Sequence, residues 1–391
     1  MSICGVIAEY NPFHNGHALH LQAARSQTNA AGIVCIMSGH FVQRGEPAIC
    51  SKQSRAQMAL THGADIVLEL PAAYATGSAE RFASAAVTTL TACGIVTDLC
   101  FGSESGDLTA LASAARRLAD EPPDFRAELR AGLAEGRTFP AARSIAAGGA
   151  AVLQTPNDIL AVEYIKAIYK QNSPLSPCAI KREGAGYHDE GIQSKLASAT
   201  AIRRVLAVGG KGWQTAMPRE AADLLQTELA AKCAPIVLDD FSQAFFYALA
   251  TTPRAALAHR ADIAEGLENR ILRYAESCAV LSVLASAVKT KRYTHTRIQR
   301  ALLHILLQID AADVLADVPY IRVLGFRRES EDLLKHLCTE ATLPVVTNLK
   351  NTQALPAAAL RALDIERRAT AVYRLAALPL RTEDSEPMVI V

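Results

Sequence analysis

The sequence has almost no net charge and no cysteine pattern of the kind that holds a zinc ion or a disulfide framework. Its 391 residues include 40 Lys and Arg against 39 Asp and Glu, a formal net charge of +1. An RNA or phosphate site must therefore be a local patch, and we expect no DNA partner. The nine cysteines are an odd number without any C-x-x-C pair, which indicates reduced core residues. We predict no metal-binding cluster.

The sequence also lacks long apolar runs and a targeting segment at its start. No stretch reaches the roughly 18 uncharged apolar residues that a membrane-spanning helix needs, and MSICGVIAEYNPF is not a basic leader followed by an apolar run. We therefore expect a cytoplasmic protein with no membrane partner. With 50% hydrophobic and 20% charged residues the chain can bury a large core, which excludes disorder as its main state and indicates two or three domains.

Short apolar runs alternate with longer amphipathic ones over the first two hundred residues. This alternation is typical of parallel strands joined by crossover helices, so we predict a doubly wound α/β fold with a parallel five-stranded Rossmann-like sheet. The strands are expected at 3–10, 31–39, 64–71, 96–104 and 177–183, and the helices at 17–25, 51–62, 78–92 and 107–118, several of them stopped near a glycine such as Gly63 or Gly94.

Two regions break this rhythm. Residues 121–176 begin with Glu121-Pro122-Pro123 and continue with alanine-rich helical segments, including 157–170, which predicts a helical insertion. Beyond about residue 220 helix-period patterns dominate, and only 318–326 resembles a strand. We therefore divide the chain into an α/β domain of residues 1–215 and a mainly helical domain of residues 216–391.

The most informative segment, 7–20, joins the first strand to the first helix. His14 and His17 stand three residues apart at the positive end of the predicted helix, where two imidazole N–H groups and free backbone amides make an anion site. Gly16 permits close backbone approach to a phosphate. The run HNGH matches the H-x-G-H signature of nucleotidylyltransferases related to class I aminoacyl-tRNA synthetases. Two histidines that only cap or pack the helix start are the alternative, and metal ligation is another.

A second half of that signature lies at 198–203. The run SATAIR resembles the S-x-T-x-[IL]-R motif that these enzymes carry after the fifth strand. Ser198 suits a helix N-cap, Thr200 falls in the first turn, and Arg203 can reach a polyphosphate from the next turn. A helix cap followed by a solvated arginine is the alternative interpretation.

Further segments resemble one family, the tRNA(Met) cytidine acetate ligases, from Cys4 to at least Phe326. They are YNPFHNGH at 10–17, MSG at 37–39, QRGEPA at 43–48, LELP at 68–71, FGSE at 101–104, REGAGYHD at 182–189 and KRYT at 291–294. His40 departs from the asparagine expected in many relatives. The resemblance implies that the protein activates acetate with ATP as acetyl-adenylate, releases pyrophosphate, and acetylates the wobble cytidine of elongator methionine tRNA at the anticodon loop to N4-acetylcytidine.

The resemblance also implies where ATP binds. Together with the second motif it gives this set: Ile7, Ala8, Glu9, Tyr10, Asn11, Pro12, Phe13, His14, Asn15, Gly16, His17, Ala18, Leu19, His20, Gly102, Asn157, Arg182, Glu183, Ser198, Thr200 and Arg203. Asn157 follows Thr155-Pro156, so a helix cap is as good an interpretation there. Acetate is already ionised at neutral pH, so attack on the α-phosphate needs charge neutralisation instead of a base. We assign that role to His14 and His17, with Mg²⁺ assisting at the phosphates.

Three cations near the second strand are candidates for holding acetate or pyrophosphate. They are Arg44, which follows that strand, and Lys52 and Arg55, which open the next helix. A solvated helix face is the alternative for Lys52 and Arg55. We interpret Asp65 and Glu69 as hydrogen-bond partners between elements and not as catalysts.

The best RNA candidate is the basic run at 289–300, which contains no acidic residue. Its candidate residues are Lys289, Lys291, Arg292, Tyr293, Arg297 and Arg300. The cations would contact phosphates and the tyrosine would stack on a base. Alternatively, the arginines are the polar stripe of an amphipathic helix. For the whole protein, adenylyl transfer to a small molecule and non-catalytic RNA binding or ATP sensing are the competing functions.

Overall fold

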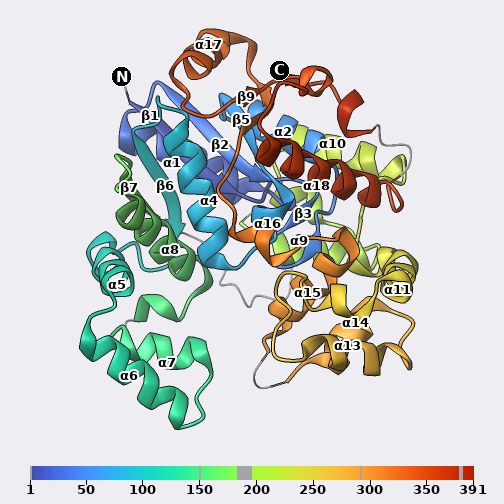
Figure 1. Cartoon of the computed structure of the whole chain (residues 1–391). Helices are drawn as coiled ribbons and strands as arrows, with labels where there is room; N and C mark the ends of the chain where they lie inside the picture. The colour runs from blue at the N-terminus through green and yellow to red at the C-terminus, as the bar shows by residue number, and fades with distance from the viewer. Residues whose placement is uncertain (1, 149–150, 183–195, 291–292, 378–381) are drawn as a thin grey trace.

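The computed structural model describes residues 2–148, 151–182, 196–290, 293–377 and 382–391. Its centre is a sheet that is covered by helices on both faces (Figure 1). In the described part of the chain, no helix combines the length and the apolar character that crossing a membrane requires.

The central sheet runs in the order β10-β8-β5-β2-β1-β6-β7, and β9 pairs with β8. Its strands are β1 (Ile3–Ala8), β2 (Gly32–Ser38), β5 (Ile66–Leu70), β6 (Asp98–Ser103), β7 (Ser176–Lys181), β8 (Ile321–Phe326), β9 (Val345–Val346) and β10 (Val389–Ile390). The five strands expected from the sequence are β1, β2, β5, β6 and β7. They lie next to one another in the order β5-β2-β1-β6-β7 and all pair in parallel, so the predicted fold class is confirmed. Every residue of β2 and β5 is buried, as their continuous apolar runs require.

The sheet is wider than the sequence indicates. Strand β8 lies antiparallel beside β5, with Glu69 opposite Arg322, and β10 and β9 extend the sheet in parallel with β8. The apolar run at 318–326 does form a strand, but its sequence carries no sign of the sheet it joins. Strands β9 and β10 have two residues each, too short for a periodic signal. Because β8 and β10 lie beyond residue 215, the sheet includes parts of both predicted domains.

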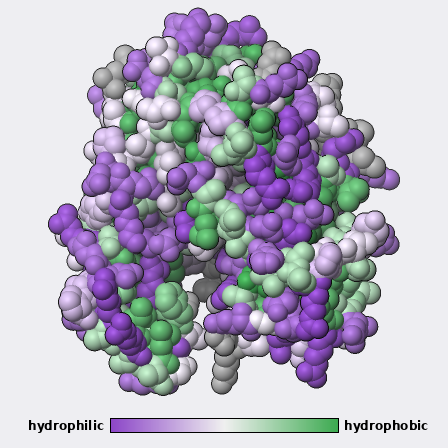
Figure 2. Space-filling model, viewed as in Figure 1, coloured by the Kyte–Doolittle hydropathy of each residue, from purple (hydrophilic) through white to green (hydrophobic). Residues whose placement is uncertain are grey.

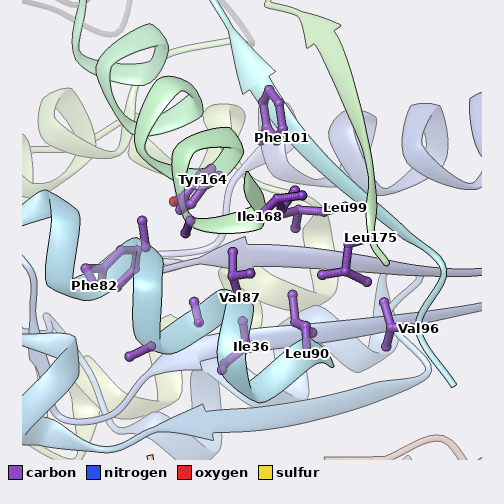
Figure 3. Packing of buried hydrophobic residues seen from close by; sticks show 14 of the residues in the cluster. Ile36, Phe82, Val87, Leu90, Val96, Leu99, Phe101, Tyr164, Ile168 and Leu175 are labelled. Carbon is purple, nitrogen blue, oxygen red and sulfur yellow. The ribbon is translucent and has the colours of Figure 1, made fainter. Parts of the chain in front are cut away.

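Two helical layers enclose the sheet. One face is covered by α4 (Ala79–Ala92), α5 (Leu108–Asp120), α8 (Pro156–Gln171) and α17 (Glu331–Glu340), and the other by α1 (Asn15–Thr28), α2 (Lys52–Thr61), α9 (Ala199–Ala207) and α10 (Arg219–Ala230). On the first face, Phe82 and Leu90 of α4 belong to one buried cluster with Ile168 of α8 and Leu99 of β6 (Figure 3). The predicted helices of the first two hundred residues are thus all present.

Local signals set several of these helix ends. Ser78 caps α4 by accepting a hydrogen bond from the amide of Arg81, at 3.4 Å. Gly94 follows α4 at φ +72° and Gly63 follows α2 at φ +114°, so both predicted glycine stops have backbone conformations that disfavour a side chain.

One part of the predicted insertion, 121–176, packs on the sheet, and another part projects from the molecule. Its α8 is part of the layer on the sheet, where Ala161, Val162 and Ile165 are fully buried. The two preceding helices, α6 (Pro123–Ala134) and α7 (Phe139–Ala146), pack on each other and project from the body of the molecule (Figure 1).

The C-terminal half is mainly helical, as expected, and has a core of its own. Its helices are α11 (Ser242–Thr251), α12 (Arg254–Leu257), α13 (Leu267–Ala275), α14 (Leu281–Val288), α15 (His295–Leu307), α16 (Ala311–Leu315) and α18 (Ala357–Tyr373). Buried residues of α11, α13, α14, α15 and α18 share this core with Phe41 of the short hairpin formed by β3 (Phe41–Val42) and β4 (Glu46–Pro47), and with Ala72 and Ala73 of α3 (Ala72–Ala75).

A buried ion cluster attaches α18 to the sheet. The Nζ of Lys52, which is fully buried, lies 2.6 Å from Glu69 of β5, 3.2 Å from Glu366 of α18 and 2.7 Å from Glu383 of the short helix η6 (Glu383–Ser385). Glu366 also accepts a hydrogen bond from the amide of Ala72, at 2.8 Å. The three carboxylates raise the pKa of Lys52 against the effect of burial. Three chain segments are therefore joined around one ammonium group.

Replacing this lysine should cost far more than replacing a surface lysine. We expect Lys52→Met to lower the free energy of unfolding by about 3–5 kcal/mol, because three carboxylates lose the charge that compensates them in a buried place. Chemical denaturation at neutral pH measures the change.

The matched control is Lys335→Met on α17. Lys335 pairs with Glu331 and Asp332 at 3.1 and 3.3 Å but is 66% exposed, so its loss should leave the free energy of unfolding nearly unchanged. Equal effects of the two substitutions would contradict the role assigned to the buried cluster.

Candidate active site

The turn between β1 and α1 is built around two interlocked histidines. His14 is the N-cap of α1, and its Nδ1 accepts a hydrogen bond from the amide of Gly16 at 3.0 Å. The amide of His14 in turn donates to Nδ1 of His17 at 3.2 Å. The two rings stack with centroids 3.7 Å apart. A side chain at position 16 would come within 2.9 Å of the His14 ring, so the glycine makes room for that ring.

These hydrogen bonds define what the two imidazoles can do. Because Nδ1 of each ring accepts a backbone N–H, a neutral ring must carry its proton on Nε2. Burial lowers the pKa of His14 to about 3, and the charges of Arg182 and Arg203 act in the same direction. Burial and the neighbouring His14 lower the pKa of His17 well below its ordinary value. Each ring therefore offers one Nε2–H donor and no positive charge. Free backbone amides were expected at this helix start, but the amide of Gly16 donates to His14.

Aromatic side chains pack against the histidine pair. His17 contacts Tyr10 edge to face, with centroids 4.9 Å apart, and lies 5.6 Å from Phe13. Phe13 stacks on His62 at 5.5 Å. Tyr10 and Phe13 are almost completely buried, and Tyr10 has φ +48°, a left-handed conformation that turns the chain from β1 towards the helix. Tyr10 and Phe13, two residues of the segment predicted to bind ATP, therefore pack against the histidines.

Two arginines adjoin this turn from other elements. Arg203 of α9 donates to the carbonyl of Asn11 at 2.8 Å and lies 3.4 Å from the hydroxyl of Thr200. Ser198 caps α9 through the amide of Ala201, as predicted. Arg182 follows β7, is exposed, and covers Gly102 of β6, where a Cβ would stand 3.3 Å from Arg182 Cγ. Gly102 thus makes room for that side chain.

The remaining predicted ATP residues divide into groups. Ile7, Ala8 and Glu9 are half-buried at the end of β1, while Asn11 and Pro12 are buried, and Asn11 accepts a hydrogen bond from the amide of Ile49 at 2.7 Å. Asn15, Ala18 and His20 are half-buried on α1, whereas Leu19 is 51% exposed. Burial lowers the pKa of His20 to about 4. Glu183 lies outside the described residues.

Asn157 is tied into the start of α8. Its Nδ2 donates to Glu104 at 2.6 Å, and the amide of Asp158 donates to the same carboxylate at 2.9 Å. Glu104 therefore caps this helix from the loop after β6, a role that the sequence reasoning missed. The arrangement brings Asn157 to the same edge of the sheet as Gly102.

The prediction for Lys52 and Arg55 is corrected by the structure. Both side chains are fully buried, and Lys52 is held by the three carboxylates described above. Arg55 donates to the backbone carbonyls of Cys50 at 3.2 Å, Glu9 at 2.8 Å, Ser38 at 3.0 Å and Gly39. The cations that follow Ser51 thus face the interior and fix loops, so they are not offered to acetate or pyrophosphate. Arg44 is half-buried and close enough to act on the pKa of Arg203.

Part of the RNA prediction is corrected as well. Tyr293 is 6% exposed and its hydroxyl donates to the carbonyl of Ala264 at 3.3 Å, so it is a core residue and no stacking platform. Arg300 is 8% exposed and makes two contacts with Asp262, at 2.8 and 3.1 Å. Lys289 is exposed, and Arg297 is half-buried with its guanidinium 5.0 Å from the Tyr293 ring. Lys291 and Arg292 lie outside the described residues.

The prediction that Asp65 and Glu69 form contacts between elements is confirmed. Glu69 pairs with Lys52, and Asp65 accepts from Arg25 and from the amide of Ile33 at 2.7 Å.

Among the described residues, one group could in principle hold a metal ion, namely His40, Glu366 and Glu383. All three are buried, and Lys52 already lies 3.2 and 2.7 Å from the two carboxylates. The ammonium group already occupies the place between these carboxylates, so a metal ion there would have to displace Lys52. This cluster therefore does not fit the Mg²⁺ that we expect with ATP.

The histidine pair, Arg182 and Arg203 together suit a polyphosphate. Neutral Nε2–H donors and two guanidinium groups converge from three elements at the carboxyl ends of parallel strands, where ligands of open α/β sheets bind. Such donors can neutralise charge that develops on phosphate oxygens without transferring a proton.

A family model described as HIGH Nucleotidyl Transferase matches residues 1–386. The chain thus has the fold and the histidine motif of that class. The tRNA(Met) cytidine acetate ligase of Thermoanaerobacter sp. (strain X514) is 41% identical over 359 residues, which is 89% of each chain. The protein of that name from Caldicellulosiruptor saccharolyticus is 43% identical over 343 residues, 86% of this chain and 85% of its own. The chain belongs to the tRNA(Met) cytidine acetate ligase family.

Solved structures agree with this assignment. The apo crystal structure of Thermotoga maritima TmcAL matches with a TM-score of 0.93 at 32% identity, and the structure bound with alpha-thio ATP matches with 0.91 at 31%. Both matches cover 100% of both chains.

The buried histidines should make the protein less stable in mild acid. Burial lowers the pKa of His14 to about 3 and that of His40, which also faces Lys52 and Arg55, well below its usual range. Below about pH 6.5 the unfolded chain binds protons that the folded chain does not, so stability falls as pH falls. Each such histidine should remove about 2 kcal/mol between pH 7.5 and pH 5.

Replacing one buried histidine isolates this effect. His40→Asn should reduce the loss of stability between pH 7.5 and pH 5 by about 2 kcal/mol, measured by chemical denaturation at both pH values. His336→Asn, an exposed position on α17, is the matched control. A wild-type pH dependence in His40→Asn would show that His40 is not held neutral by the fold.

Proposed function

We propose that this protein is an ATP-dependent ligase that activates acetate and acetylates a cytidine of methionine tRNA. The observation that carries the proposal is the pair of neutral, stacked imidazoles, fixed by backbone N–H groups beside Arg182 and Arg203. Membership of the tRNA(Met) cytidine acetate ligase family and the likeness to a structure bound with alpha-thio ATP support it.

In the first step, an acetate oxygen attacks the α-phosphorus of ATP. A new P–O bond forms and the bond to the β-phosphate oxygen breaks, so pyrophosphate leaves and acetyl-adenylate remains. Since acetate is already ionised, no base is required. The Nε2–H groups of His14 and His17 would donate to the phosphate oxygens as charge builds up, and Arg203 with Thr200 would hold the leaving pyrophosphate. Arg44 is the remaining candidate for holding acetate or pyrophosphate.

In the second step, the exocyclic amine of the cytidine attacks the acetyl carbonyl. The C–N bond forms, the C–O bond to AMP breaks, and the amine loses a proton to solvent. AMP is a good leaving group, so the main requirement is to bring the cytidine base to the acetyl-adenylate. The anticodon loop would be bound in a single-stranded, splayed form that exposes this base.

The substrate implies two further parts of the proposal. Mg²⁺ would accompany the ATP phosphates and neutralise part of their charge when bound. The wobble cytidine of elongator methionine tRNA would be the acceptor, and a tRNA substrate would place the reaction in the cytoplasm. We keep residues 1–215 as the catalytic part and residues 216–391 as the tRNA-binding part of this proposal.

The first test concerns acetate activation without RNA. Wild type should catalyse exchange of labelled pyrophosphate into ATP only when acetate is present. His14→Ala and His17→Ala should each lower the rate about 100- to 1,000-fold, because each removes a donor to the developing charge. An exposed histidine variant, His336→Ala, should keep the wild-type rate.

The outcome also separates the competing functions. ATP binding without acetate-dependent exchange would contradict the ligase and favour a non-catalytic sensor. Exchange that requires a phosphorylated small molecule instead of acetate would favour adenylyl transfer to that molecule.

The second test concerns RNA. Lys289→Ala and Arg297→Ala should each weaken tRNA binding several-fold and flatten its dependence on salt concentration, because each removes a cation near phosphates. Neither should change acetate-dependent exchange in the absence of RNA. Lys335→Ala on α17 is the matched control, and equal tRNA affinity in all three variants would assign RNA binding to another surface.

A further inference from the structure

The hairpin β3–β4 lies between the nucleotide site and the helical C-terminal half. Its first strand is anchored in the helical core, where Phe41 is fully buried and lies 5.8 Å from Phe241 and 5.9 Å from Tyr373, measured between ring centroids. The hairpin is therefore fixed on the side of α11 and α18.

The hairpin also rests directly on α15. Gly45, at φ +77°, lies so close to this helix that a Cβ would come within 2.7 Å of the Gln299 carbonyl carbon and closer still to the amide nitrogen of Arg300. Backbone against backbone leaves no space for a side chain, so the hairpin cannot shift relative to α15 without losing this contact.

From this fixed position the hairpin reaches the nucleotide site at two points. The amide of Gln43 donates to the carboxylate of Glu9, at the end of β1, at 2.9 Å. The carboxylate of Glu46 lies 3.9 Å from Nη2 of Arg203 through one oxygen and accepts from Nε2 of Gln299 at 3.2 Å through the other. Glu46 thus connects α15 with the arginine that also holds the Asn11 carbonyl.

The electrostatics of Arg203 fit this connection. Burial lowers the pKa of Arg203, and the Glu46 and Glu9 carboxylates oppose that shift. The side chain of Arg203 is 22% exposed and that of Glu46 is 32% exposed, so the pair is only partly screened by solvent. Nη1 of Arg203 is held by the Asn11 carbonyl, and the Glu46 carboxylate is the negative charge that faces Nη2.

We propose that Glu46 is a positioning residue for the reaction: anchored to α15 by Gln299, it orients Arg203 towards the phosphates of ATP. The inference rests on the proposed function, because it takes Arg203 as a phosphate-binding group. The QRGEPA segment would thereby fix Arg203 relative to the helical half of the chain, a role that its sequence does not reveal.

The test compares acetate-dependent pyrophosphate exchange, without RNA, in three variants and two controls. Glu46→Gln keeps an acceptor for Gln299 but loses the charge that faces Arg203. Its kcat/KM for ATP should fall by up to about fivefold, mainly through KM, with an unchanged melting temperature. Gln299→Ala should give a smaller fall in the same direction. Glu46→Gln with Gln299→Ala should be no worse than Glu46→Gln alone, because both act through one contact.

Controls keep the inference falsifiable. Glu46→Asp, which restores the charge on a shorter side chain, should recover part of the lost kcat/KM. Glu340→Gln, an exposed position on α17, should behave as wild type. A wild-type KM for ATP in Glu46→Gln, or additive effects of the two substitutions, would overturn the inference. Failure of the wild type itself to exchange pyrophosphate would instead contradict the proposed function.

Discussion

The edge of the sheet that carries the candidate active site depends on one buried guanidinium. Arg55 is fully buried, and its guanidinium meets backbone carbonyls from the ends of β1 and β2 and from the segment before α2. Arg55 donates to four of them, those of Glu9, Ser38, Gly39 and Cys50. An unpaired buried carbonyl costs about 1–3 kcal/mol, and the planar fork of arginine can satisfy several at once. Since Glu9 immediately precedes the turn at Tyr10, the same contacts fix the approach to His14.

Sequence reasoning predicted the elements that depend on local pattern. Continuous apolar runs identified the five parallel strands, and the HNGH and SATAIR runs indicated the turn before α1 and helix α9, which meet where Arg203 contacts the Asn11 carbonyl. It did not predict burial that depends on distant partners. Lys52 and Arg55 have the spacing of a solvated helix face, but Lys52 is neutralised by Glu366 and Glu383, more than three hundred positions further along the chain. For the same reason, the sequence predicted that Arg300 and Tyr293 contact RNA. In the structure Arg300 pairs with Asp262, and the Tyr293 hydroxyl donates to the Ala264 carbonyl.

The site is built on both halves of the chain. His14 and Arg203 belong to the first half, yet the loop that faces them is held by α18, where the Tyr373 hydroxyl donates to the carbonyl of Ala48 at 2.7 Å and His40 lies 3.2 Å from Thr370. The helical half therefore supports the candidate ATP site as well as offering a candidate surface for RNA. The hollow between the lower lobes of the molecule, one with α6 and α7 and the other with α13 to α15, is visible in Figure 2.

The buried ammonium of Lys52 also constrains how the molecule can be made. During synthesis on the ribosome, Lys52 emerges long before Glu366 and Glu383, and strand β8 is still missing from the flank of β5. Until those segments arrive, Lys52 has only Glu69 among its three carboxylate partners. The ion cluster around Lys52, and the flank of β5 that β8 covers, can thus be completed only after residue 383 has left the exit tunnel.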